Sequence, residues 1–315
     1  MKKPPALKPG DTVVLVAPAS PAKIEELQPG IQLFESRGYN VQLGECCILR
    51  DDGKRAPDEQ RAKELTTAWF DPQIKAVICA RGGYGCSRLF PYLNLQKMAQ
   101  HPKLFVGFSD ITVLHIALNK LGLATLHAPM PYSFQKQRPD WVIEMFFQAL
   151  EGTSPIKTPN HKQTQTIVSG KAEGIVIGGC LSLICDNIGT NFGLDSLIRK
   201  TSDDVKQYIL LLEDVDVPTH RVDAMLTHLI NTGIMQHITG IIVGEMTNTH
   251  EKYGDFLGMN WKDIVIERLS PFKVPMVLGF PFGHCSEMSS LPMGINAKLD
   301  ADEGILEYTE LGVEI

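Results

Sequence analysis

The sequence has few of the features that mark several large protein classes. No cluster of lysine and arginine stands out, and 36 acidic residues outnumber 30 basic ones, giving a net charge of −6. A surface that binds nucleic acid is therefore not expected. Proline, glycine or charge interrupts each apolar stretch well short of the ~20 residues that a membrane-spanning helix needs. The opening stretch, MKKPPALKPGD, has no apolar core of a signal peptide, so we expect a cytoplasmic chain without a membrane segment.

Cysteine is present, but not in the pattern of a disulfide framework or a zinc site. The chain has 7 cysteines, an odd number, and no CxxC pair. Several lie in apolar runs, which is typical of small buried thiols in a reducing compartment. We therefore expect free thiols, and neither a metal nor a cofactor.

The first half of the chain alternates strand-like and helix-like segments. Pro29 and Gly30 interrupt the first helical pattern, which predicts a kinked or split helix. Strands that alternate with helices predict a doubly wound parallel sheet. The expected strands are 12–18, 39–45, 74–80 and 104–108, and the expected helices are 21–37, 58–69 and 110–122.

The pattern changes after a stretch rich in threonine, proline, lysine and glutamine, which is typical of a linker. Beyond it, strands are expected at 170–179, 208–215, 238–246 and 274–283, helices at 181–187, 219–232 and 261–269, and an antiparallel hairpin at 295–310. We predict an α/β protein with an N-terminal doubly wound domain (1–150), a linker (151–168) and a smaller, β-rich C-terminal α/β domain (169–315).

Polar clusters follow four of the expected strands, and in open α/β sheets ligands bind at the carboxyl ends of strands. One cluster contains Ser109, which lies between a strand-like and a helix-like segment in VGFSD. This context is that of a nucleophile elbow, in which Gly107 would give the backbone room, but Ile111 makes the match to G-x-S-x-G partial. An ordinary helix N-cap is the alternative interpretation of Ser109.

A serine nucleophile needs a base. His284 is the leading candidate because it follows an apolar strand in the turn-rich sequence GFPFGHCSE. His115 lies on the helix after Ser109, nearly two turns away, and is poorly placed to reach back. His127, at the end of LATLHAPM, is harder to exclude, and each histidine can also be purely structural.

The base in turn needs an orienting group. Glu213 is the best candidate because five apolar or aromatic residues lead straight into it. Asp214 and Asp216 compete with it, and any of the three carboxylates can simply end the strand.

The glycine-rich loop RGGYG (81–85) follows a buried strand. Such a loop can bring backbone N–H groups close to an oxyanion, although a plain tight turn explains it as well. It does not match G-x-G-x-x-G and no Walker lysine follows, so a nucleotide phosphate site is poorly supported.

The order of these motifs resembles the LD-carboxypeptidase family of serine peptidases, a group that includes murein tetrapeptide carboxypeptidases and microcin C self-immunity hydrolases. The segments VVLVAPASP, GGCLSLI and HRVDAMLTHL also look like signatures of this family. The motifs that carry the resemblance, from about residue 10 to about 295, are RGGYG (81–85), GFSDIT (107–112), LHAPM (126–130), LLEDVD (211–216) and GFPFGH (279–284).

The resemblance implies a role for each candidate. Ser109 would be the nucleophile, His284 the general base and acid, and Glu213 the group that orients His284. The backbone N–H groups of Asp110 and Gly83 would form the oxyanion hole. The resemblance also implies a homodimer, no metal and a site between the two domains.

The implied reaction is hydrolysis of the amide bond between an L-configured centre and a terminal D-amino acid, here D-Ala of a murein tetrapeptide, through an acyl-enzyme. One alternative is an immunity hydrolase that cleaves aminoacyl-sulfamoyl adenylates, for which Tyr253, Phe256 and Trp261 could stack on adenine or could simply be packing aromatics. A non-catalytic protein that binds a small ligand is the other alternative.

Overall fold

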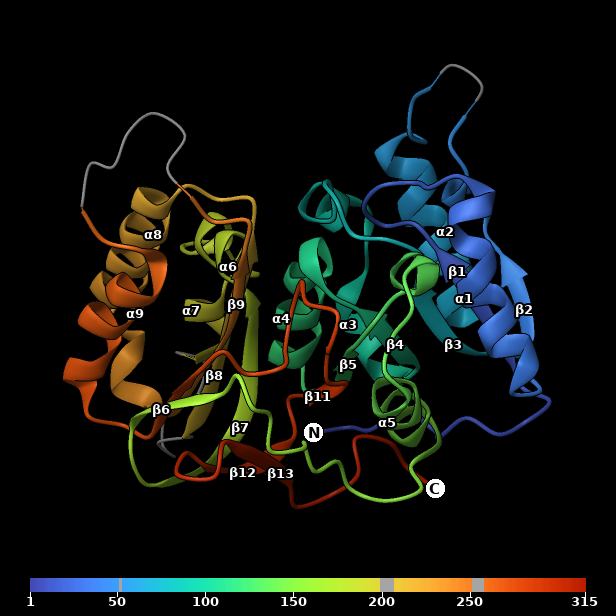
Figure 1. Cartoon of the computed structure of the whole chain (residues 1–315). Coiled ribbons are helices and arrows are strands. Elements are labelled where there is room, and N and C mark those ends of the chain that lie inside the picture. Colours follow the sequence, from blue (N-terminus) through green and yellow to red (C-terminus); the bar gives the residue numbers. More distant parts are fainter. Residues whose placement is uncertain (51–52, 199–206, 251–257) are drawn as a thin grey trace.

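The computed structural model describes residues 1–50, 53–198, 207–250 and 258–315. Two sheets stand side by side with helices around each of them (Figure 1). None of the helices in these ranges is long and apolar enough to cross a membrane. The mixed α/β class predicted from the sequence is confirmed.

The first sheet has the strand order β11-β5-β4-β3-β1-β2. Its strands β1 to β5 pair in parallel, as the alternation of strands and helices predicted. These strands are β1 (Thr12–Val16), β2 (Asn40–Leu43), β3 (Ile74–Cys79), β4 (Leu104–Gly107) and β5 (Thr125–His127). The longer helices around them are α1 (Ile24–Ser36), α2 (Asp58–Phe70), α3 (Leu95–Gln100), α4 (Thr112–Lys120) and α5 (Asp140–Glu151).

The second sheet has the order β13-β12-β7-β8-β9-β10-β6. Strands β7 to β10 are parallel, and antiparallel strands lie at both edges. Its strands are β6 (Gln165–Val168), β7 (Lys171–Cys180), β8 (Tyr208–Val215), β9 (Ile238–Thr247), β10 (Met276–Leu278), β12 (Asn296–Asp300) and β13 (Ile305–Tyr308). Its helices are α6 (Leu181–Asn187), α7 (Leu194–Ile198), α8 (Thr219–Asn231) and α9 (Trp261–Leu269).

Three details differ from the sequence-based expectations. Helix α1 is one continuous helix that contains Pro29, rather than a split one. The expected linker 151–168 ends in β6, which pairs with β10. Strand β11 (Leu291–Met293), from the expected C-terminal domain, instead pairs with β5 in the first sheet. The chain thus crosses back to the first sheet after residue 290. The division into two domains at 151–168 stays a proposal, with β6 taken from the linker and β11 assigned to the first sheet.

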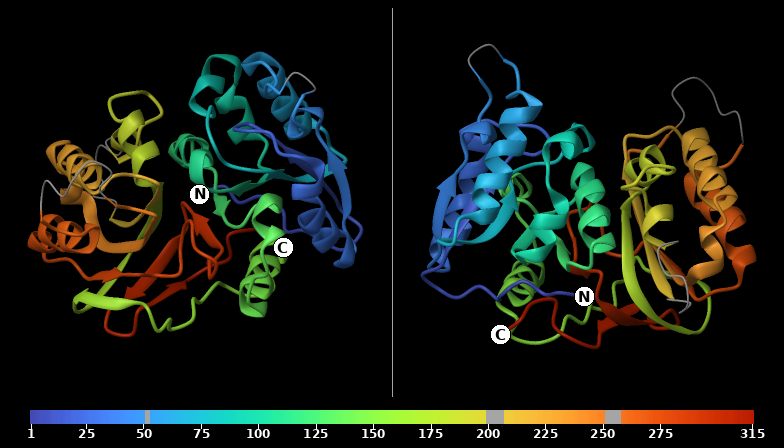
Figure 2. Two further views of the ribbon diagram at one scale, coloured as in Figure 1. Left: turned by 45° about the horizontal axis from the view of Figure 1, so that its top comes forward. Right: turned by 180° about the vertical axis from the view of Figure 1, so that it is seen from behind.

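A shared core joins the two sheets. Successive side chains of a strand point to opposite faces, so β8 serves two cores. Leu210 and Leu212 pack in the cluster that contains α6 to α9, while Leu211 belongs to a cluster that also contains Val106 and Leu126 of the first sheet. Both views of Figure 2 show the two halves side by side, and its right view shows the N- and C-termini at the lower end of the molecule. The carboxyl ends of β4 and β8 therefore have fixed positions relative to each other.

Candidate active site

Ser109 occupies a sharp turn between β4 and helix α4. Phe108 is extended, Ser109 then takes a left-handed conformation with φ 65°, and a 3₁₀ turn, η3 (Ser109–Ile111), leads into α4. A left-handed conformation costs a residue with a side chain about 1–2 kcal/mol. A Cβ on Gly82 would lie 2.8 Å from the Ser109 Cβ, and one on Gly107 would lie 2.9 Å from the Ile111 side chain. Two glycines thus leave room for a strained turn that projects the serine hydroxyl.

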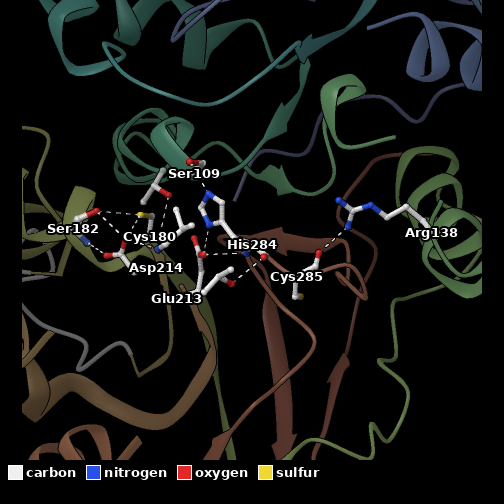
Figure 3. Close-up of polar contacts among 11 residues, drawn as sticks. Ser109, Arg138, Cys180, Ser182, Glu213, Asp214, His284 and Cys285 are labelled. Atoms are coloured by element: carbon white, nitrogen blue, oxygen red, sulfur yellow. Dashed lines mark hydrogen bonds and ion pairs between the residues drawn. The ribbon is translucent and has the colours of Figure 1, made fainter. Parts of the chain in front are cut away.

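The imidazole of His284 lies between Ser109 and Glu213 (Figure 3). Its Nε2 is 2.9 Å from the Ser109 Oγ, and its Nδ1 is 2.6 Å from the Glu213 Oε2. The same carboxylate oxygen accepts the backbone N–H of His284 at 3.2 Å. An ionised carboxylate only accepts hydrogen bonds, so we assign the proton of neutral His284 to Nδ1. Its Nε2 lone pair then faces the serine hydroxyl.

Opposing influences act on the pKa of His284. Burial is the largest single influence and lowers it, because charge is disfavoured away from water. The charge of Glu213 and its hydrogen bond, with smaller contributions from Asp214 and Asp216, together outweigh burial and raise the pKa above its usual value. His284 is therefore a stronger base than an isolated histidine.

Glu213 is completely buried at the carboxyl end of β8. Its approach to His284 depends on Gly283, whose φ is 89° and where a Cβ would lie 2.4 Å from the Glu213 Oε2. Its second oxygen, Oε1, has no hydrogen-bond partner among the described residues. One oxygen of the carboxylate is thus directed entirely at His284.

The two competing aspartates have other partners. Asp214 is buried and accepts hydrogen bonds from the backbone N–H groups of Ser182 and Val215. Burial raises the pKa of Asp214. Asp216 accepts a hydrogen bond from the Asn248 side chain. The structure therefore places Glu213, and neither aspartate, against His284.

The glycine loop lies directly beside the serine. Gly83 has a φ of 113°, and a Cβ there would collide with the Ser20 hydroxyl. Ser20 donates its backbone N–H to the Gly82 carbonyl, and its hydroxyl accepts the Tyr84 N–H. Ser20 thereby holds the loop, with Gly82 as the glycine nearest to Ser109.

Asp110 follows the serine, but its carboxylate serves another purpose. It is buried and accepts the Cys86 N–H at 2.7 Å, and burial raises its pKa. This bond ties η3, which leads into α4, to the residue that follows the glycine loop. The backbone N–H of Asp110 is the part of the residue that the sequence analysis assigned to the oxyanion hole.

The two alternative histidines are buried away from the serine hydroxyl. His115 bonds to the Gly107 carbonyl and to Thr125, and burial lowers its pKa to about 4. His127 packs against Phe282, neither ring nitrogen has a hydrogen-bond partner among the described residues, and burial lowers its pKa strongly. Neither makes a described hydrogen bond with Ser109.

Trp261, the described member of the aromatic group suggested to stack on adenine, does not support that role. Trp261 is buried in the core of the second half, packed with residues of α8 and α9. The adenine-stacking role considered for it is therefore wrong, and Trp261 is a packing aromatic. Tyr253 and Phe256 lie outside the described residues.

A pocket of about 410 Å³ opens at the site. Phe108, His284 and Cys285 line one part of it, and the segment 132–138, which includes Arg138, lines another. Phe108 also packs edge-on against the His284 ring, with ring centroids 5.0 Å apart. Within the described ranges, no group of three or more His, Cys, Asp or Glu side chains could hold a metal ion.

Sequence reasoning missed several residues that shape this site. Ser20 and Gly82 lie in motifs that were noticed, but only the folded loop shows what they contact. Gly283 stands directly before His284, and its need for a positive φ is a backbone property that the sequence hints at only through the glycine itself. Arg138 comes from a proline-flanked segment that carries no motif.

Two family models match this chain, one in each half. The model of the LD-carboxypeptidase N-terminal domain matches residues 13–128, and that of the LD-carboxypeptidase C-terminal domain matches residues 173–299. The chain belongs to the LD-carboxypeptidase family. It is therefore an enzyme of the serine peptidase class.

Three relatives show the range of the family. A putative carboxypeptidase of Streptomyces coelicolor is 34% identical over 309 residues, covering 96% of this chain and 95% of its own. The crystal structure of muramoyltetrapeptide carboxypeptidase from Oxalobacter formigenes has a TM-score of 0.76 at 30% identity, covering 94% and 97%. The microcin C7 self-immunity protein MccF, whose Escherichia coli sequence is 24% identical over 335 residues (96% and 94% covered), has a structure with aspartyl sulfamoyl adenosine. That structure has a TM-score of 0.86 at 22% identity with full coverage of both chains, a likeness of fold alone.

Proposed function

We propose that this enzyme is an LD-carboxypeptidase that removes the terminal D-Ala from a murein tetrapeptide, with Ser109, His284 and Glu213 as its catalytic triad. The observation that carries the proposal is the continuous hydrogen-bonded series from the Ser109 Oγ through His284 to the buried Glu213. The 30% identity to a structure named muramoyltetrapeptide carboxypeptidase supports the choice of substrate. Peptidoglycan recycling would be the corresponding role in a cell, and a homodimer remains a prediction from the family resemblance.

The first half of the reaction forms an acyl-enzyme. His284 Nε2 takes the proton of the Ser109 hydroxyl as Oγ attacks the scissile carbonyl carbon. The carbonyl oxygen becomes an oxyanion that accepts hydrogen bonds from the N–H groups of Asp110 and Gly83. As the tetrahedral intermediate collapses, protonated His284 gives its proton to the nitrogen of the leaving D-Ala.

The second half reverses these roles. Water gives a proton to His284 and attacks the acyl-enzyme ester, which releases the shortened peptide and restores the Ser109 hydroxyl. Glu213 keeps the Nδ1 proton in place and stabilises the imidazolium that forms in each half. The strained turn presents the nucleophile before substrate binds, so no rearrangement of the serine is needed.

The test is release of D-Ala from a purified murein tetrapeptide by the wild type and by Ser109→Ala. Removal of a triad serine typically lowers kcat by about 10⁴–10⁶-fold. Ser36→Ala, at the exposed end of α1, is the matched control and should keep full activity. Undiminished turnover by Ser109→Ala would refute the triad.

The same assay addresses the alternatives. An aminoacyl sulfamoyl adenosine offered in parallel should be hydrolysed much more slowly than the tetrapeptide, and the reverse ranking would favour an immunity hydrolase. Binding of either compound without turnover would favour a non-catalytic role.

A further inference from the structure

Arg138 is a cation that lines the same pocket as His284 but takes no part in the triad. It follows the 3₁₀ turn η4 (Pro131–Gln135) and precedes α5. Its Nε donates to the Ser133 carbonyl at 3.1 Å, and its Nη1 donates to the carbonyls of Cys285 and Ser286 at 2.8 and 2.9 Å. All three acceptors are neutral backbone oxygens.

The charge of Arg138 is not balanced within the described part of the chain. None of the ion pairs found there includes Arg138, whereas the fully buried Arg61 side chain pairs with Asp58. Arg138 is half-buried, and burial lowers its pKa. Backbone carbonyls offset only part of the cost of burying a guanidinium, so a negatively charged ligand group would be bound favourably there.

The Arg138 guanidinium also has N–H donors left for a ligand. Arginine offers five N–H donors in a planar fork, and no described residue accepts a hydrogen bond from the Arg138 Nη2. The exposed Lys136 lines the same pocket and adds a second positive charge. The pocket is therefore positive on the side formed by segment 132–138.

The position of Arg138 fits recognition of substrate rather than bond cleavage. Figure 3 shows its side chain on the opposite side of His284 from Asp214, pointing toward the segment that follows His284. It makes no described hydrogen bond with Ser109, His284 or Glu213. A group held there would be part of the bound peptide and not the reacting carbonyl.

We propose that Arg138 is the subsite that binds a carboxylate of the substrate and selects peptides that carry one. A carboxylate matches the planar fork of a guanidinium and supplies the missing charge. The inference rests on the proposed function, whose substrate offers this chemistry in two places. One is the terminal carboxylate of D-Ala, and the other is the side-chain carboxylate of diaminopimelate where that residue, and not lysine, precedes D-Ala.

The experiment combines changes in the enzyme with changes in the substrate. kcat and KM are measured for four tetrapeptides, with diaminopimelate or lysine before D-Ala and with D-Ala as a free acid or a carboxamide. The enzymes are the wild type, Arg138→Met, Arg138→Lys and the control Lys136→Met. Thermal unfolding shows which variants remain folded.

The expected result is a loss that depends on the substrate. Arg138→Met should lower kcat/KM by about 10–100-fold, mainly through KM, for peptides that carry the recognised carboxylate. It should have little effect once that carboxylate is absent or amidated. Arg138→Lys should restore part of the activity on the carboxylate peptides, and Lys136→Met should cost less than Arg138→Met because Lys136 is exposed.

Each outcome bears on the inference. Dependence on the terminal carboxylate and dependence on diaminopimelate both support it and identify the source of the charge. An equal loss on all four peptides would overturn it, because Arg138 would then serve only to tether the Cys285–Ser286 carbonyls. If the wild type turns over the peptides but the effect of Arg138→Met depends on neither carboxylate, the inference fails and the proposed function stands. If the wild type turns over none of the peptides, the proposed function and the inference both fail.

Discussion

The two halves of the molecule position their parts of the candidate active site by different means. In the first half, Ser109 lies in a strained, left-handed turn for which Gly82 and Gly107 leave space. The second half holds Glu213 and His284 by burial, a short hydrogen bond and opposite charge. The comparison indicates that the position of Ser109, the proposed nucleophile, depends on backbone geometry, while that of His284, its proposed base, depends on electrostatics.

Of the changes that test this comparison, the largest loss is expected from removing the charge of Glu213. Glu213→Gln keeps the shape of the side chain but removes its charge and lets an amide face the imidazole, which favours the wrong tautomer of His284. By comparison with an Asp-to-Asn change in a serine protease triad, kcat should fall by about 10³–10⁴-fold. Steady-state kinetics on the murein tetrapeptide measure this, with Glu310→Gln, in an exposed pair with Lys3, as the control. A loss below tenfold would mean that the charge of Glu213 is not needed.

A smaller loss of kcat is expected when the turn that holds Ser109 is crowded. In Gly82→Ala the new methyl group would lie 2.8 Å from the Ser109 Cβ and 3.0 Å from its Oγ, so the serine must move. A displacement near the chemistry can cost about 10²-fold in rate. Gly10→Ala is a control for the substitution itself, since a Cβ there meets nothing within 4 Å, although its φ of 94° adds strain. Unchanged kcat in Gly82→Ala would show that the turn tolerates crowding.

The pH dependence of kcat/KM tests the electrostatic effect of Glu213 on His284. His284 must be neutral to accept the serine proton, and its pKa is raised, so kcat/KM should fall tenfold per pH unit below a midpoint that lies above the ordinary histidine value of 6.5. In Glu213→Gln no carboxylate at this position offsets the lowering of the His284 pKa by burial, so the midpoint should move to lower pH. A midpoint that does not shift in the variant would contradict the assignment of Glu213 as the group that raises the pKa of His284.

Much of this organisation is readable from the sequence. The parallel α/β pattern follows from buried strands alternating with helices, and the positions of VGFSD, LLEDVD and GFPFGH at strand ends directed attention to Ser109, Glu213 and His284. The roles of these three residues remain predictions. The position of His284 after a strand made it the leading base, and helix spacing counted against His115, but His127 and a purely structural role stayed open until the family resemblance favoured His284.

What the sequence could not supply depends on contacts between distant segments. Strand β11 joins the first sheet because Leu291–Met293 returns to β5, after strands β6 to β10 of the second sheet and before its strands β12 and β13. Arg138 meets Cys285 and Ser286 across 147 and 148 residues of chain, and no local pattern signals that contact. The choice between stacking and packing for Trp261 stayed open for the same reason, since only the packed core shows that its ring is buried.

The smallest predicted effect concerns the stability of the strained turn. Ser109→Gly removes the cost of a left-handed residue with a Cβ, so it should be more stable than Ser109→Ala by about 1 kcal/mol. Both variants lack the hydroxyl and should be equally inactive. Chemical denaturation of the two proteins measures the difference, and equal free energies of unfolding would show that the turn stores no strain.

The most direct test of the central claim is to identify the residue that reacts. The wild type is treated with a serine-directed phosphonate, and peptide mass spectrometry locates the adduct. A single adduct on Ser109, formed in step with loss of D-Ala release and absent in His284→Ala, is the predicted result. Complete inactivation with the adduct on another residue, or full activity of the enzyme labelled on Ser109, would contradict the account.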